Sequence, residues 1–224
     1  MKRYGTFISA SNEPRGLWFA IDGKFFRFMS KLADLMILNL LWILCSIPII
    51  TIGASAAALY KVTMEMAENR ESYVVRTFIR TYLDNMKRAT VGWMAFLTCQ
   101  TVLAAAFVYG QYISEGGREA LVVGIMVCEI LLMLVFLYIV PLMTRKGIET
   151  NALRLAALLA VANLPWSAVL LAGEGVILLM AVRYPAFTIP VLLVVGVSGT
   201  AYMMSHIYLH VFEKAGLKTL LVTE

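Results

Sequence analysis

Charge is missing from long stretches of this sequence. Four stretches contain no charged residue or a single glutamate, and they cover residues 89–114, 120–144, 155–182 and 184–212. Each is longer than the roughly 20 residues with which a helix crosses a hydrocarbon core about 30 Å thick. Only helices and closed barrels satisfy all their backbone polar groups in lipid. The pattern therefore predicts an integral membrane protein with several helical spans.

The chain as a whole is also poor in charge. Charged residues make up 15% of the 224 residues and hydrophobic ones 61%, and the mean hydropathy is +0.80. Soluble domains average about 25% charged and about 45–50% apolar residues, so one soluble core would not bury this much apolar surface. The net charge of +5 is typical of basic cytoplasmic loops. No basic stripe with interleaved aromatic residues is present, which argues against nucleic acid as a partner.

Cysteine is scarce, and enzyme motifs are absent. The three cysteines, Cys45, Cys99 and Cys128, lie in apolar runs without a CxxC spacing. We interpret them as small buried hydrophobic residues rather than as a disulfide or zinc framework. The sequence contains no P-loop, GxSxG, HExxH or GxGxxG motif, and its apolar runs hold few polar groups that could converge. We therefore expect a protein that is not an enzyme and that uses no cofactor or metal.

We also expect no cleavable signal peptide, because the first apolar run begins only after Asp34. The segment 1–31 before it is basic and aromatic. Its apolar residues recur at helical spacing: Leu17, Trp18, Ile21, Phe25, Phe28 and Met29. This pattern predicts an amphipathic helix at the cytoplasmic membrane interface, with a disordered tail as the alternative.

The uncharged segment 35–60 differs from the later runs because it contains helix-breaking residues. Pro48 removes a backbone donor and clashes with the preceding turn, and Gly53 permits a turn or a close helix contact. Two interpretations remain. One is a broken helix that crosses once, and the other is a hairpin with helices over residues 32–47 and 54–68.

Loop charge distinguishes these interpretations. Both the amino-terminal segment and residues 61–88 are basic, and the positive-inside rule places both in the cytoplasm. An even number of crossings, or a re-entrant hairpin, must then separate them, so we favour the hairpin. Its second arm has Lys61, Glu65 and Glu68 on one face, which leaves open a partial entry into the bilayer.

The later runs predict spans over residues 89–113, 120–143, 164–182 and 187–212. The expected fold is thus all-α, a polytopic transmembrane bundle of about six membrane helices, or about five with a broken first helix, and both termini are cytoplasmic. We expect one transmembrane domain over residues 32–212, which includes the cytoplasmic segment 61–88. It lies between the interfacial segment 1–31 and a cytoplasmic tail of residues 213–224.

Residues 39–64 carry a distinctive order of residue types. The segment reads NLLWILCSIPIITIGASAAALYKVTM and contains Trp42, Pro48, Thr51, Gly53, Ala54 and Tyr60. It resembles the signature of the YesL-type family of bacterial membrane proteins, as do residues 76–90 and 138–145. The resemblance implies a multi-pass protein of the bacterial cytoplasmic membrane, often encoded beside sugar-uptake ABC transporters. The family's molecular activity is uncharacterised, so no catalytic or ligand residue carries over.

The few ionisable residues inside the predicted spans are the candidates for function. Glu129 and Glu174 lie within apolar runs, where an unpaired carboxylate costs several kcal/mol. His206 and His210 lie one helical turn apart on the last span, without an evident third ligand for a metal. Structural roles are the alternatives: a protonated, hydrogen-bonding Glu129, a Glu174 near the outer surface and a His210 at the cytoplasmic interface.

Other polar and small residues predict helix packing. We interpret Asn39, Gln100 and Asn163 as hydrogen-bonding groups between helices, and the small residues between Gly53 and Ala58 as a helix-packing face. We therefore expect neither the three polar residues nor the small-residue face to bind a substrate.

Two functions fit these observations. The first, which we favour, is a non-enzymatic accessory or regulatory partner of a carbohydrate-uptake system of the ABC type, embedded in the lipid bilayer. The second is a small transporter or channel, a homo-oligomer coupled to protons or cations through Glu129 and Glu174. A weak similarity between residues 77–90 and 151–168 leaves open a parallel repeat, which several transporter folds contain.

Overall fold

The structure is a computed structural model that describes residues 24–70, 73–112, 115–144 and 151–216. Every regular element in these ranges is a helix, which confirms the predicted all-α fold. In chain order the elements are α1 (Lys24–Ser46), the 3₁₀ turn η1 (Ile49–Thr51), α2 (Ile52–Ala67), α3 (Val74–Gly110), α4 (Glu115–Met143), α5 (Ala152–Ala162), α6 (Leu164–Arg183), α7 (Pro185–Val191), the π-helical turn η2 (Leu192–Gly196) and α8 (Val197–Lys214).

The described helices make this a multi-pass membrane protein. Five segments among them are long and apolar enough to cross a membrane: Phe25–Ser46, Val74–Gly110, Gly117–Met143, Leu164–Arg183 and Pro185–Lys214. Among the described helices, α2 and the short apolar α5 lie outside this set. The 16 residues of α2 extend over about 24 Å. That length is less than a hydrocarbon core of about 30 Å, so α2 by itself reaches across only part of a bilayer.

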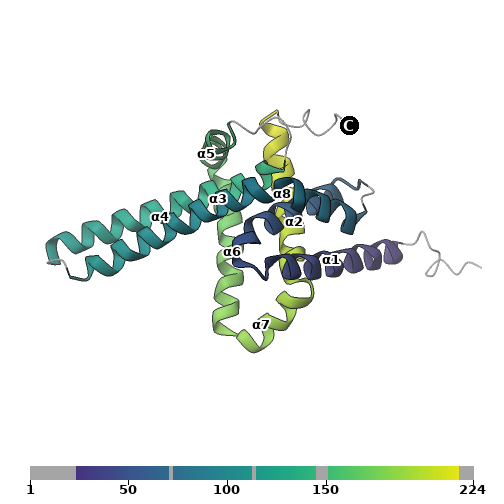
Figure 1. Ribbon diagram of the computed structural model, residues 1–224, viewed down its shortest axis with the longest axis horizontal. Coiled ribbons are helices and arrows are strands. Elements are labelled where there is room, and N and C mark those ends of the chain that lie inside the picture. The colour runs from purple at the N-terminus through teal and green to yellow at the C-terminus, as the bar shows by residue number, and fades with distance from the viewer. Residues whose placement is uncertain (1–23, 71–72, 113–114, 145–150, 217–224) are drawn as a thin grey trace, which may run out of the picture.

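α1 and α2 form the predicted hairpin. The chain leaves α1, turns through η1 and returns along α2 (Figure 1). At the open end, Lys31 Nζ donates a hydrogen bond to Asn69 Oδ1 at 2.9 Å. Near the turn, the hydroxyl oxygens of Ser46 and Ser55 lie 2.6 Å apart. These two contacts show that the arms run side by side in opposite directions.

The start of the first helix differs from the predicted boundary. α1 begins at Lys24, so residues 24–31 of the predicted interfacial segment continue without a break into the first membrane helix. The rest of that segment, residues 1–23, lies outside the described part of the chain. Phe25 and Phe28 are exposed in the first turns of α1, where a membrane interface favours aromatic side chains.

α2 is largely buried, and its small residues allow this. The small side chains on its buried face are Gly53, Ala54, Ser55, Ala57 and Ala58. A Cβ added at Gly53 would lie 2.6 Å from the Ala89 carbonyl oxygen and 2.6 Å from Trp93 Cβ. Only glycine permits this approach of α2 to α3, which confirms the predicted helix-packing face.

α3 is longer than the predicted span 89–113. It runs without a break for 37 residues from Val74, a length of about 55 Å. Much of the predicted cytoplasmic segment 61–88 is therefore helical. The first half of α3 packs against α2 through Phe78 and Ala89. Its second half pairs with α4 and projects from the body of the molecule (Figure 1).

The two segments that suggested a repeat fold differently. Asn85 lies inside α3, and its side-chain nitrogen donates to the Thr81 carbonyl at 3.0 Å. Asn163 instead ends α5 and precedes α6, with its side-chain nitrogen 3.3 Å from the Leu159 carbonyl. The first segment thus lies in one continuous helix, whereas the second is divided between two helices. This local structure does not support the repeat.

Buried residues concentrate where the helices meet. The largest cluster joins α2, α4, α5, α6 and α8 and includes Tyr138, Leu142, Tyr208 and Phe212. Two apolar hairpins project from this core, α3–α4 and α6–α8 with α7 near its tip, and they run in crossing directions in Figure 1. Membrane helices tilt by about 20° on average. If both hairpins cross one bilayer in this arrangement, at least one of them is tilted much further.

Candidate functional site

Three tyrosines from different helices form a contact cluster in the core. The ring centroid of Tyr208 on α8 lies 5.5 Å from that of Tyr60 on α2 and 5.7 Å from that of Tyr138 on α4, both edge-to-face. The Tyr208 hydroxyl donates to the Leu137 carbonyl at 3.0 Å, and the Tyr138 hydroxyl lies 3.0 Å from Ser167 Oγ. Aromatic pairs contribute about 0.5–1.5 kcal/mol beyond their burial. The cluster therefore acts as a joint between three helices.

Glu174 lies at the edge of this tyrosine cluster. Its side chain is exposed on α6, next to Gly173. A Cβ added at the neighbouring Gly173 would lie 3.1 Å from Met204 Cε, so α6 approaches α8 here. The Tyr60 hydroxyl has a weak acceptor, Met204 Sδ, at 3.9 Å. Glu174 is thus the candidate carboxylate that adjoins the contact between α6 and Met204, the acceptor of the Tyr60 hydroxyl.

Glu129 lies in the α3–α4 hairpin and has its own partner. Its Oε1 accepts a hydrogen bond from Gln100 Nε2 at 2.8 Å, and both side chains are partly buried. Along α4 it is about 14 Å from Tyr138. Because a hydrogen-bonded carboxylate is less costly to bury than an isolated one, the pair supports a structural role for Glu129. It also confirms the predicted bond between helices for Gln100.

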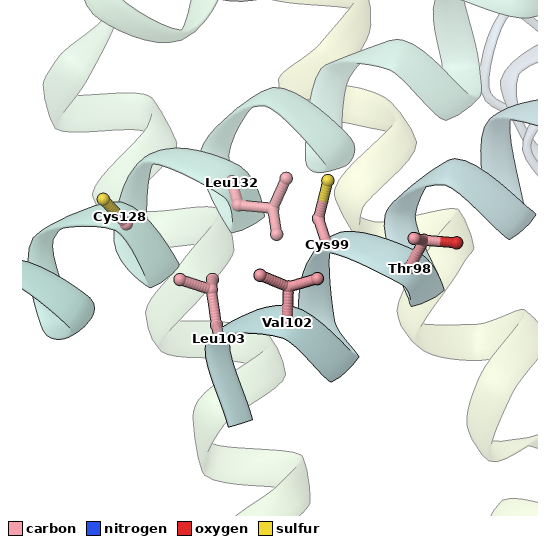
Figure 2. Close-up of a pocket in the computed structure, with 6 residues that line it drawn as sticks. All are labelled: Thr98, Cys99, Val102, Leu103, Cys128 and Leu132. Carbon is pink, nitrogen blue, oxygen red and sulfur yellow. The ribbon is translucent and has the colours of Figure 1, made fainter. Parts of the chain in front are cut away.

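An apolar groove runs beside this polar pair. It has a volume of about 340 Å³ and is lined by Thr98, Cys99, Val102, Leu103, Cys128 and Leu132, which Figure 2 shows on two neighbouring helical segments. The thiols of Cys99 and Cys128 are free, and both residues are exposed, contrary to the expectation of buried cysteines. Since the groove offers little beyond apolar atoms, it fits a hydrophobic side chain or an acyl chain better than a polar substrate.

The two histidines of α8 are exposed and have different neighbours. The ring centroid of His206 lies 5.1 Å from that of Tyr202, and the ring centroid of His210 lies 5.4 Å from that of Trp166 on α6. Within the described ranges, no hydrogen bond or ion pair joins them to the two candidate carboxylates. Those ranges also contain no group of three or more His, Cys, Asp or Glu side chains that could hold a metal ion.

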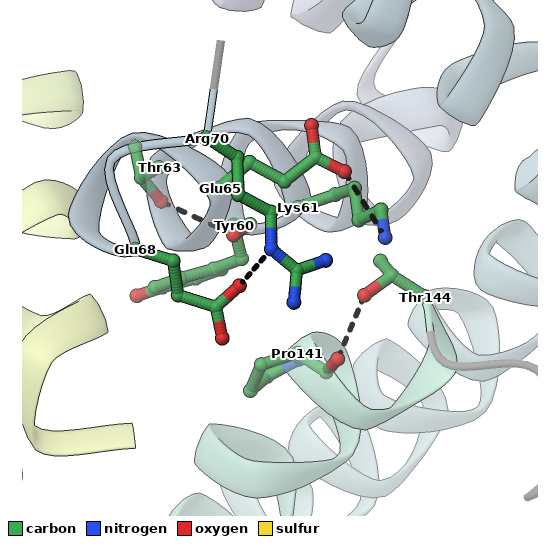
Figure 3. A network of polar contacts seen from close by, with 8 residues as sticks. All are labelled: Tyr60, Lys61, Thr63, Glu65, Glu68, Arg70, Pro141 and Thr144. Carbon is green, nitrogen blue, oxygen red and sulfur yellow. Dashed lines mark hydrogen bonds and ion pairs between the residues drawn. The ribbon is translucent and has the colours of Figure 1, made fainter. Parts of the chain in front are cut away.

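The charged end of α2 packs beside the end of α4 (Figure 3). Lys61 Nζ lies 3.2 Å from Glu65 Oε1, and Arg70 Nε lies 3.0 Å from Glu68 Oε2. Thr144 Oγ1 donates back into the last turn of α4 at 2.9 Å. Partly exposed ion pairs contribute little to stability, but they reduce the charge that this arm of the hairpin presents. These ion pairs are therefore compatible with a position of this end of α2 at the membrane surface.

Three residues of the sequence motif, Pro48, Thr51 and Gly53, lie at the hairpin turn. Thr51 Oγ1 donates to the carbonyls of Cys45 and Pro48, each at 2.8 Å. Trp93 Nε1 on α3 donates to the Ile49 carbonyl at 2.9 Å and ties the turn to that helix. Together with the glycine contact to α3, these bonds give the turn a structural role.

The remaining motif residues point towards neighbouring helices. Ala54 is fully buried, and Tyr60 belongs to the tyrosine cluster. The Trp42 indole N–H is buried without a hydrogen-bond partner among the described residues. An unpaired buried donor costs about 1–3 kcal/mol of stability. Trp42 is therefore the motif residue whose polar group does not contribute to holding the helices together.

Among the described residues, the most extensive polar contact between distant segments centres on Asn39, which is fully buried. Its Nδ2 donates to the carbonyls of Leu192 at 3.0 Å and Leu193 at 2.6 Å, and its Oδ1 accepts from the Ser198 N–H at 3.1 Å. The π-helical turn that follows Pro190 displaces these backbone groups from regular helical bonding. The predicted role of Asn39 between helices is confirmed. The lone Asn and the distant Pro were visible in the sequence, but their proximity was not.

Comparison with known proteins finds similarity in the first half of the chain. The family model described as "Protein of unknown function, DUF624" matches residues 35–107, which include the second half of α1, all of α2 and nearly all of α3. No curated protein and no solved structure matches the chain. The matched segment is therefore similar to a family whose function is unknown.

Proposed function

We propose that this protein is a non-enzymatic accessory or regulatory partner of an ABC-type carbohydrate-uptake system in the bacterial cytoplasmic membrane. The observation that carries the proposal is the separation of the candidate polar residues. Glu129 pairs with Gln100 in one hairpin, whereas Glu174 lies on α6 where that helix approaches α8, and His206 contacts Tyr202. Ionisable groups that move an ion or proton mark one continuous path. Their distribution on separate elements therefore favours association over transport.

The α3–α4 hairpin offers the surface for such an association. Its exposed residues are mostly apolar, among them Val102, Val123 and Met126. Helices associate in membranes through close packing and occasional hydrogen bonds between polar side chains. The groove at Cys99 and Val102 provides a depression for a side chain of a neighbouring helix. The carbohydrate-uptake partner rests on the resemblance of residues 39–64 to the YesL-type family.

Affinity purification from native membranes in a mild detergent, followed by mass spectrometry, tests this proposal. Val102→Trp fills the groove, and Val182→Trp is the matched control because Val182 is an exposed valine of α6. We expect transporter subunits to accompany the unchanged protein and the Val182 variant but not the Val102 variant. Recovery of all three proteins without transporter subunits, at normal yield, would contradict the proposal.

The transport alternative has one observation in its favour, the position of Glu174 next to Gly173, where α6 approaches Met204 and its contact with the Tyr60 hydroxyl. If the protein is a coupled transporter, Glu174→Gln and Glu129→Gln should abolish substrate uptake while the protein is still present in normal amount. If it is an accessory protein, both variants should retain partner binding. Uptake and co-purification measured on the same cells separate the two functions.

A further inference from the structure

Lys31 occupies a partly buried position where α1 meets α8. Its Nζ donates to Asn69 Oδ1 at 2.9 Å and to the Tyr202 hydroxyl at 3.4 Å. The same nitrogen lies 5.8 Å from the centroid of the Tyr202 ring. Three segments that are far apart in the sequence therefore hold this ammonium group in one place.

The charge of Lys31 has no acidic partner among the described residues. A lysine ammonium has three N–H donors, and the two acceptors that it meets, an amide and a hydroxyl, are both neutral. The ion pairs of the described ranges join other residues, and Asp34, one turn further along α1, forms none with Lys31. A partly desolvated cation with an unused donor is stabilised by an anion.

The surroundings of Lys31 are those of a membrane interface. Arg27, one helical turn earlier on α1, is exposed, and Phe25 and Phe28 are 64% and 61% exposed. His206 contacts the same Tyr202 ring, with centroids 5.1 Å apart. Basic side chains mixed with aromatic ones are typical of the headgroup layer on the cytoplasmic side.

We propose that Lys31, positioned by Asn69 and Tyr202, binds the phosphate group of an anionic phospholipid at the cytoplasmic surface. Arg27 and His206 lie at the edges of this site and add basic groups. The exposed phenylalanines of α1 supply apolar surface for the acyl chains, which a free phosphate ion would not contact. The site is independent of the carbohydrate-uptake proposal, because it requires no protein partner.

Native mass spectrometry of the full chain in a neutral detergent tests the site, with phosphatidylglycerol, phosphatidylcholine and inorganic phosphate as separate probes. Lys31→Gln should weaken phosphatidylglycerol binding about fivefold, which corresponds to one basic residue at an anionic surface. Lys31→Arg should retain most of the binding. Lys87→Gln is the control, since it removes the same charge from an exposed lysine of α3, and it should leave binding unchanged.

Three results would overturn the assignment. Unchanged phosphatidylglycerol binding by the Lys31→Gln variant would exclude the site, and an equal loss in the Lys87→Gln variant would show that attraction is diffuse. Binding of inorganic phosphate that depends on Lys31, without a preference for phosphatidylglycerol over phosphatidylcholine, would assign the site to free phosphate. If Lys31→Gln lowers the yield of folded protein, Arg27→Gln replaces it, because that side chain is exposed. The expected loss is then about twofold, and none would count against the site.

Discussion

Asn39 allows the sharpest test of how the two halves of the chain hold together. The change Asn39→Ala removes three hydrogen bonds, two to the carbonyls of Leu192 and Leu193 and one from the Ser198 N–H. Alanine offers no polar atom to replace the Asn39 amide, so these backbone groups would lose their side-chain partner in a buried place. The change should therefore weaken the contact between α1 and the start of α8.

The magnitude follows from measurements on hydrogen bonds in membranes. Such bonds average about 0.6 kcal/mol and reach about 1.7 kcal/mol, so three of them give a loss of roughly 2–4 kcal/mol when the cost of unpaired buried groups is included. For a chain of this size, that loss lowers the midpoint of thermal unfolding by roughly 5–10 °C. Thermal unfolding in detergent, followed by circular dichroism, measures the shift.

Asn163→Ala is the matched control, because Asn163 is also a buried asparagine. Its side-chain nitrogen makes a single local bond, to the Leu159 carbonyl at 3.3 Å, so its removal should cost no more than about 1 kcal/mol. Hydrogen exchange adds a local measurement, since amides of residues 192–198 should exchange faster in Asn39→Ala only. Equal midpoints for the two variants would refute the reasoning.

Three further predictions concern helix packing. Gly53→Ala should destabilise the protein by about 1–3 kcal/mol, because its Cβ would meet the Ala89 carbonyl. Gly124→Ala, with no atom within 4 Å, should instead leave the stability unchanged or raise it by up to about 1 kcal/mol. Thermal unfolding of the two variants checks this contrast. Glu129→Leu should lower the free energy of unfolding by about 1–2 kcal/mol, because it leaves the Gln100 side chain without its acceptor. Glu129→Gln keeps an acceptor and should unfold like the unchanged protein. Tyr138→Phe should cost about 1 kcal/mol in the same assay, because it removes the bond to Ser167; no loss would show that this bond is dispensable.

Local sequence patterns predicted the helices well. The break at Pro48 and Gly53 and the small residues after it predicted the hairpin and the buried face of α2, since both depend on backbone chemistry close in the sequence. The start of α3 at Val74 was missed. A basic segment was interpreted as separate from the span that follows it, but no helix-breaking residue lies between them.

The candidate site was predicted only in part. Glu129 and Glu174 stood out because carboxylates are rare in apolar runs, and the partner of Glu129 is the predicted polar residue Gln100. The tyrosine cluster was missed, because Tyr60, Tyr138 and Tyr208 resemble ordinary apolar or interfacial residues when each is read in its own helix. Their meeting depends on how α2, α4 and α8 pack.

The sequence by itself determined that the protein enters a membrane, which segments form helices and where the first hairpin turns. These features depend on hydropathy over about 20 neighbouring residues and on single prolines and glycines. Only the tertiary structure decided that Asn39 meets the π-helical turn 153 residues later, that Lys31 meets Tyr202, and that the two long hairpins run in crossing directions. Such contacts depend on the packing of whole helices, whose apolar surfaces are alike in composition and differ only in shape.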